Sequence, residues 1–174
     1  LKLISRKTLK TYKQRLLLGG APNLEALQPH IESYAEKVIR GNSYAKAIAQ
    51  VESDRTEGRR LVMATASYEL YVAAIAKRLG FDDVIGTRLM TNNNGQVLPK
   101  IDGENCYDAA KLDRIKAFLA EQSLDRDQLH IRSYSDHVSD APMLDFADEA
   151  VATTPSPALR QMAKTRNWKI VDWD

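Results

Sequence analysis

Hydrophobic residues recur every three or four positions along much of the first 58 residues, as they do on one face of a helix. Such stripes span residues 24–39 and 44–51. Pro29 lies inside the first stripe, where it predicts a kink or a restart of the helix. Ser43 precedes the second stripe and is placed to cap its helix. We therefore expect residues 1–58 to be helical throughout.

The pattern changes after Gly58, where short apolar runs alternate with helical stripes. Asn92-Asn93-Asn94-Gly95 predicts the turn of a hairpin over residues 87–101. Strands that alternate with helices are typical of an α/β fold with a mostly parallel sheet. The predicted strands are 61–64, 84–85, 129–134, 150–152 and 169–171, and the predicted helices are 70–79, 108–121, 142–146 and 156–166.

Composition favours an ordinary globular protein, since 44% of the 174 residues are hydrophobic and 28% are charged. Cys106 is the single cysteine, which rules out an internal disulfide and fits a cytoplasmic setting. Residues 1–20 contain six basic residues and no acidic one. This stretch is either a solvated helix face or a peripheral contact with an anionic membrane. We expect no nucleic-acid partner, and the sequence does not predict an oligomeric state.

Polar residues stand where two of the predicted strands stop, and ligands of parallel sheets bind beyond the carboxyl ends of the strands. Thr65 follows the strand at 61–64, and its hydroxyl can hold a phosphate oxygen or cap the next helix. Asp136 and Asp140 follow the strand at 129–134. This carboxylate pair suits Mg²⁺, but the two residues can equally form a turn and a helix cap.

Lys111 is expected in the first turn of the helix at 108–121. A lysine at this position opposes the helix dipole, so it is better placed if it neutralises an anion such as a phosphoryl group or a carboxylate. The plainer interpretation is an exposed, solvated lysine.

The order of hydroxyl, lysine and paired carboxylates resembles the haloacid dehalogenase-like superfamily of phosphohydrolases. The similarity is to subfamily IB, which includes phosphoserine phosphatase and bacterial lipid phosphatases of the phosphatidylglycerophosphatase type. The matching segments are Leu61–Ser67, Tyr68–Leu89, Lys111, Tyr134–Leu144 and Leu159–Trp173. The resemblance implies a Rossmann-like core over residues 59–174, with the hairpin at 87–101, and an N-terminal helical cap over residues 1–58.

The same resemblance implies a role for each candidate residue. Asp136 would bind Mg²⁺, Thr65 would hold a phosphoryl oxygen, and Lys111 would offset the charge of an aspartyl-phosphate. Asp140 would orient Lys111 or a metal-bound water. His137 stands where the family usually has a small residue, so it either narrows the site, contacts the leaving group or turns outward.

The attacking aspartate of the family lies in an Asp-x-Asp-x-Thr motif before the cap, and this sequence has no such motif. Asp125-Arg126-Asp127 and Asp172-Trp173-Asp174 stand in the wrong places. We expect a segment that carries the motif to precede Leu1. The chain by itself is then expected to be inactive.

The resulting prediction is a magnesium-dependent phosphomonoester hydrolase, cytoplasmic or membrane-associated. It would act on a small phosphorylated metabolite or a phospholipid head group. The alternative is a non-catalytic phosphate-binding or degenerate domain of the same family. A receiver-like or flavodoxin-like module is a third interpretation, which the hairpin at 87–101 and the spacing of Lys111 disfavour.

Overall fold

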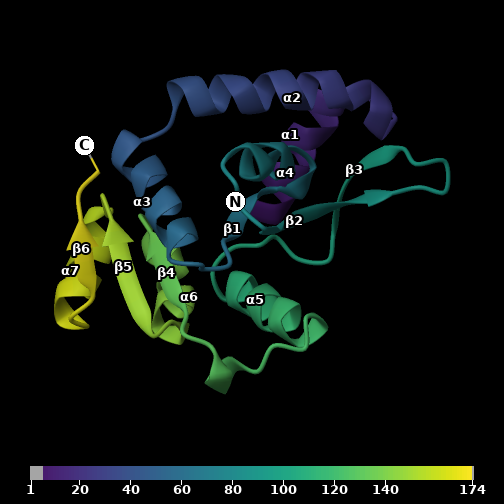
Figure 1. Ribbon diagram of the computed structural model, residues 1–174. Helices are drawn as coiled ribbons and strands as arrows, with labels where there is room; N and C mark the ends of the chain where they lie inside the picture. The colour runs from purple at the N-terminus through teal and green to yellow at the C-terminus, as the bar shows by residue number, and fades with distance from the viewer. Residues whose placement is uncertain (1–5, 174) are drawn as a thin grey trace. The chain divides into compact units, whose positions relative to one another are not determined.

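The computed structural model describes residues 6–173, which form two compact units. The first unit contains the described residues up to Ser43 together with Arg60–Cys106. The second contains Tyr44–Arg59 together with the described residues from Tyr107 onward. The helices (Figure 1) are α1 (Arg6–Leu18), α2 (Leu24–Gly41), α3 (Ala45–Thr56), α4 (Glu69–Arg78), α5 (Ala109–Glu121), α6 (Ala141–Phe146) and α7 (Pro157–Thr165), with 3₁₀ turns η1 (Arg126–Gln128) and η2 (Val138–Asp140). The strands are β1 (Val62–Tyr68), β2 (Asp83–Thr91), β3 (Val97–Asp102), β4 (Arg132–Ser135), β5 (Glu149–Thr153) and β6 (Lys169–Val171).

The sheet of the first unit has the order β1-β2-β3. β1 runs parallel to β2, and β2 turns back into β3 as an antiparallel hairpin. The Oδ1 atom of Asn92 accepts the main-chain N–H groups of Asn94 and Gln96, each at 3.0 Å. Gly95 has a φ of +71°, which a glycine adopts without steric cost. The hairpin and its turn are thus confirmed.

Helix α2 packs against α4 through a small apolar cluster of Ile31, Ala35 and Ala74. Pro29 lies inside α2, which runs unbroken from Leu24 to Gly41, so the expected restart does not occur. The missing N–H of Pro29 affects only the carbonyl four residues earlier, at the exposed Glu25. Solvent can satisfy that carbonyl because Glu25 is exposed.

Helix α1 packs along β3 with its polar side inward. Gln14 is buried and Lys10 is half-buried, whereas Leu9, Tyr12 and Leu16 are exposed. The apolar positions of this helix therefore face away from its own unit. The basic stretch predicted over residues 1–20 begins outside the described residues, which start at residue 6.

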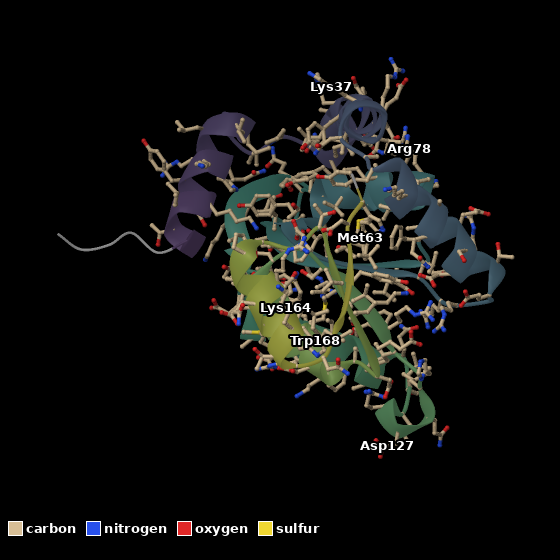
Figure 2. All side chains as sticks on the ribbon, turned by 90° about the vertical axis from the view of Figure 1, so that its left-hand side faces the viewer. Lys37, Met63, Arg78, Asp127, Lys164 and Trp168 are labelled. Carbon is tan, nitrogen blue, oxygen red and sulfur yellow. The ribbon has the colours of Figure 1, made fainter. Side chains whose placement is uncertain are left out.

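The sheet of the second unit is β4-β5-β6, and both pairings are parallel (Figure 1). Its core is made of Leu144, Ala152, Leu159 and Ala163. Trp168, labelled in Figure 2, follows α7 and packs against this cluster. These contacts join α6, α7 and β5 into one hydrophobic layer.

The mostly parallel sheet is confirmed, because β2–β3 is the one antiparallel pair among the named strands in residues 6–173. The strands are divided between two three-stranded sheets, with β1 and β4 each at an edge of its own sheet. The compact units do not follow the boundary between residues 58 and 59. The compact units are defined by which residues lie near one another in space, whereas a cap and a core are defined by their roles. The division into a cap over residues 1–58 and a core over residues 59–174 therefore stays a prediction.

Several predicted bounds and one predicted cap are wrong; the strand predicted at 84–85, for example, is the longer β2. β1 continues through Thr65 to Tyr68, although its pairing with β2 becomes irregular after Ala64. β4 begins at Arg132 rather than at residue 129, because the main-chain N–H of Ile131 bonds the Asp148 carboxylate at 2.7 Å instead of continuing a ladder. The N-cap of α3 is Tyr44 and not Ser43.

Candidate active site

A buried ion pair joins the two elements that carry Lys111 and Asp140. Lys111 lies in the first turn of α5 and is 5% exposed. Its Nζ lies 2.6 Å from Oδ1 of Asp140, at the end of η2. Burying an ammonium group costs several kcal/mol unless a counter-charge accompanies it. The carboxylate of Asp140 supplies that charge.

The second oxygen of Asp140 is held by the last residue of β4. Ser135 is buried, and its hydroxyl donates to Oδ2 of Asp140 at 2.7 Å. The same hydroxyl oxygen accepts the main-chain N–H of His137 at 3.2 Å. Both oxygens of Asp140 are therefore engaged, which sets the direction in which it holds Lys111. Sequence reasoning did not single out Ser135.

Asp136 lies directly after β4 and is exposed. Its main-chain carbonyl accepts the N–H of Ser156 at 2.8 Å, which ties the turn to the start of α7. Within residues 6–173 its carboxylate has no ion pair or hydrogen bond, and no group of three or more metal-ligating side chains is found. Asp136 can thus supply one oxygen ligand to a cation.

Thr65 belongs to the first unit, whereas Lys111, Asp136 and Asp140 belong to the second. Thr65 is partly buried in the irregular part of β1, and its Oγ1 accepts the main-chain N–H of Ser67 at 3.1 Å. This contact uses the oxygen and leaves the hydroxyl hydrogen able to donate. The structure brings Lys111 and Asp140 together, and the roles of all four residues stay predictions.

A second polar cluster, also unsuspected from the sequence, lies around Lys10 in the first unit. Its Nζ donates to Oδ1 of Asn105 at 2.7 Å, to Oγ1 of Thr87 at 3.1 Å and to the main-chain carbonyl of Ala66. Burial lowers the pKa of Lys10 to about 8. Cys106 beside this cluster is fully buried.

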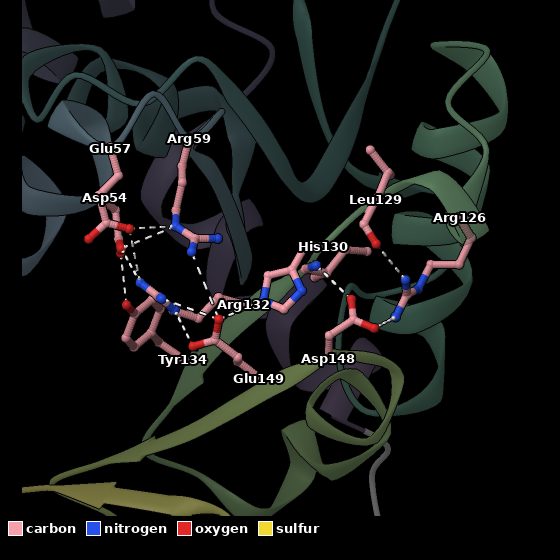
Figure 3. Close-up of polar contacts among 11 residues, drawn as sticks. Asp54, Glu57, Arg59, Arg126, Leu129, His130, Arg132, Tyr134, Asp148 and Glu149 are labelled. Carbon is pink, nitrogen blue, oxygen red and sulfur yellow. Dashed lines mark hydrogen bonds and ion pairs between the residues drawn. The ribbon is translucent and has the colours of Figure 1, made fainter.

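A charged network anchors α3 to the sheet of the second unit (Figure 3). Asp54 is 4% exposed and receives Nη1 of Arg132 at 2.6 Å and the hydroxyl of Tyr134 at 2.8 Å. Nε of Arg132 also donates to Glu149 at 2.7 Å. This bond, together with the bond from the neighbouring His130, lowers the pKa of Glu149 to about 2. Burial and the Asp54 bond raise the pKa of Tyr134 to about 12. The network fixes β4, and with it the turn that carries the candidate site.

The other Asp-x-Asp segments are not placed for catalysis. Oδ1 of Asp125 accepts the main-chain N–H of Asp127 at 3.1 Å and so caps η1. Asp172 is paired with Arg160, and Asp174 lies outside the described residues.

Comparison with known proteins identifies the family of this chain. The family model described as haloacid dehalogenase-like hydrolase matches residues 13–145, well over half of the sequence. The chain belongs to the haloacid dehalogenase-like hydrolases. This membership excludes the receiver-like and flavodoxin-like interpretations.

Two curated relatives of this chain show how far the similarity extends. The chain is 30% identical over 165 residues to the "Inhibition of morphological differentiation protein" of Streptomyces azureus, which covers 95% of this chain and 58% of that protein. It is 30% identical over 142 residues to a phosphoserine phosphatase of Mycobacterium tuberculosis, covering 82% of this chain and 44% of that enzyme. The chain thus spans about half the length of these relatives.

Solved structures share the fold. A protein of unknown function from Bordetella pertussis is 26% identical and superposes with a TM-score of 0.89, covering 98% of this chain and 75% of that one. A substrate-bound phosphoserine phosphatase superposes with a TM-score of 0.64 at 17% identity, covering 99% of this chain and 74% of that one. Both confirm the α/β architecture predicted from the sequence.

A membrane-spanning helix is not found in residues 6–173, where each helix is too short or too polar to cross a bilayer.

Proposed function

We propose that the full-length protein is a magnesium-dependent phosphomonoester hydrolase that acts through an aspartyl-phosphate. The observation that carries the proposal is the buried pair of Lys111 and Asp140, joined to the end of β4 in a chain of this hydrolase family. A buried lysine held by a carboxylate keeps a fixed positive charge where an anionic intermediate forms.

Asp136 would bind the magnesium ion. Its exposed carboxylate has no competing partner among the described residues, and Mg²⁺ takes one or two protein carboxylates and completes its shell with water and phosphate. Asp136 therefore fits as one ligand. When bound, the ion would neutralise charge on the phosphoryl oxygens.

The attacking carboxylate is proposed to lie in a segment upstream of Leu1. One of its oxygens would bond to phosphorus while the bond from phosphorus to the leaving-group oxygen breaks. A second upstream carboxyl group would give that leaving oxygen its proton and later take one from the hydrolytic water. Thr65 would donate to a phosphoryl oxygen, and Lys111, positioned by Asp140, would offset the charge of the intermediate.

The substrate is proposed to be a small phosphorylated metabolite. This choice is supported by relatives named phosphoserine phosphatase and, in Neisseria meningitidis, histidinol-phosphatase. A phospholipid head group is the alternative, for which the exposed leucines of α1 beside Lys13 and Arg15 offer support. The cytoplasmic or membrane-associated location belongs to the same proposal.

The test is hydrolysis of para-nitrophenyl phosphate by the full-length protein with and without Mg²⁺. We expect magnesium-dependent turnover that falls about a hundredfold or more in Asp136→Asn. Asp127→Asn is the matched control, because it removes another exposed carboxylate, from η1, outside the site. Retention of phosphate binding without any turnover would replace the proposal with the non-catalytic phosphate-binding alternative.

The chain from Leu1 to Asp174 is expected to show no turnover by itself. Purified separately and assayed under the same conditions, it tests where the nucleophile lies. Magnesium-dependent hydrolysis by this piece would place the attacking group within it.

A further inference from the structure

His137 is held to the candidate site by its main chain and by one nitrogen of its ring. Its main-chain N–H bonds the hydroxyl of Ser135, and that hydroxyl bonds Asp140, the partner of Lys111. His137 also directly follows Asp136 at the carboxyl end of β4, the end at which ligands of parallel sheets bind. The backbone of His137 is therefore linked through Ser135 to the ion pair.

The imidazole of His137 has a defined orientation and tautomer. Its Nδ1 accepts the main-chain N–H of Ser139 at 3.1 Å and lies 2.8 Å from the Ser139 hydroxyl. Because Nδ1 acts as an acceptor, the neutral ring carries its proton on Nε2. The residue is exposed, and Nε2 has no partner among residues 6–173. A hydrogen-bond donor is thus presented to solvent beside Asp136.

The capping contact alone does not require a histidine. His137 is the N-cap of η2, and asparagine, aspartate and serine are the residues that serve this role best. A histidine adds what these side chains lack, which is a second polar atom on the far side of the ring. That atom is free to bond a ligand, and His137 is the residue next to Asp136 in the chain.

We propose that His137 determines substrate specificity by donating its Nε2–H to an oxygen of the leaving group next to the phosphoester. The proposal rests on the proposed phosphatase function and names its substrate class: phosphate esters whose leaving group carries a carboxylate or another accepting oxygen close to the ester. A carboxylate is the best acceptor, because hydrogen bonds to ionised groups are shorter and stronger than neutral ones. His137 touches the part of the substrate that leaves and takes no part in the transfer of phosphorus.

The test compares 2-phosphoglycolate with ethyl phosphate, two esters of nearly equal size of which the first carries a carboxylate. The full-length protein is assayed as wild type and as His137→Asn, which keeps the cap of η2 but loses the distal N–H. The ratio of kcat/KM for 2-phosphoglycolate over ethyl phosphate should fall about tenfold in His137→Asn, mainly through KM. His30→Asn, at an exposed position of α2, is the control and should keep the wild-type ratio.

An equal ratio in wild type and His137→Asn would overturn the inference, since a purely structural role is rescued by asparagine. Failure of the wild type to hydrolyse both of these esters and para-nitrophenyl phosphate would instead overturn the proposed function. In that case the contact of His137 with each ester is measured by nitrogen NMR of the three histidines with Mg²⁺ present. A shift of the His137 Nε2 signal with 2-phosphoglycolate but not with ethyl phosphate supports the inference, and an unmoved signal refutes it.

Discussion

The ion pair of Lys111 and Asp140 makes a quantitative prediction about stability. Asp140→Asn keeps the shape of the side chain and its acceptor for Ser135 but removes the negative charge. The ammonium of Lys111, whose side chain is 6% exposed, then stays buried without a counter-charge. Breaking a buried pair by removing one partner costs about 3–5 kcal/mol. Because the Asp140 side chain is 12% exposed, we expect the lower end, about 3 kcal/mol.

A double-mutant cycle separates this charge effect from packing. Urea unfolding of Asp140→Asn, Lys111→Met and the double variant, followed by circular dichroism, gives the three changes in the free energy of unfolding. Lys111→Met removes the ammonium while filling much of its volume, so the double variant should be more stable than Asp140→Asn by at least about 1 kcal/mol. A loss below about 1 kcal/mol in Asp140→Asn, or additive effects in the double variant, would refute the reasoning.

Three further predictions concern the other polar clusters. Tyr134→Phe removes the hydroxyl that donates to buried Asp54 and should lower the free energy of unfolding by about 2 kcal/mol in the same urea assay, whereas an unchanged value would mean that the bond contributes nothing. Glu149 has a pKa of about 2 in the folded protein against 4.5 normally, so its contribution is present above pH 4.5 and lost as the pH falls toward 2. The melting temperature should therefore depend less steeply on pH across that range in Glu149→Gln than in the wild type. An equal dependence on pH in the two proteins would contradict this. Lys10 has its pKa lowered from 10.5 to about 8, so the folded state binds fewer protons and gains stability as the pH rises from 8 to 10.5. Lys10→Met should abolish that gain in thermal melts, and a gain that persists would assign it to another group.

Most of the elements could be predicted from local pattern, because the signals that define them are local. The Asn92–Gly95 turn and the stripe of α2 depend on residues within a few positions of one another. The start of β4 was wrong because Asp148, 17 positions away, takes the N–H of Ile131. A side chain that replaces a ladder hydrogen bond leaves no trace in the hydrophobic pattern.

The candidate site divides in the same way. The sequence by itself determined the residue types that suit phosphate and Mg²⁺ chemistry. Their positions at strand and helix ends, together with the family resemblance, identified the candidates Thr65, Lys111, Asp136 and Asp140. Only the tertiary structure showed that Ser135 and Asp140 hold the buried ammonium of Lys111.

The charged network of Asp54, Arg132 and Tyr134 depends even more on tertiary structure. Asp54 lies 78 positions from Arg132 and 80 positions from Tyr134 in the chain, and no pattern in the sequence indicates that the three residues interact. The physical reason is that a charge becomes important only when burial removes its water, and burial is decided by packing between distant segments. The sequence by itself therefore determined the helices, the strands and the candidate chemistry, while the tertiary structure decided which charges are buried and which partners they have.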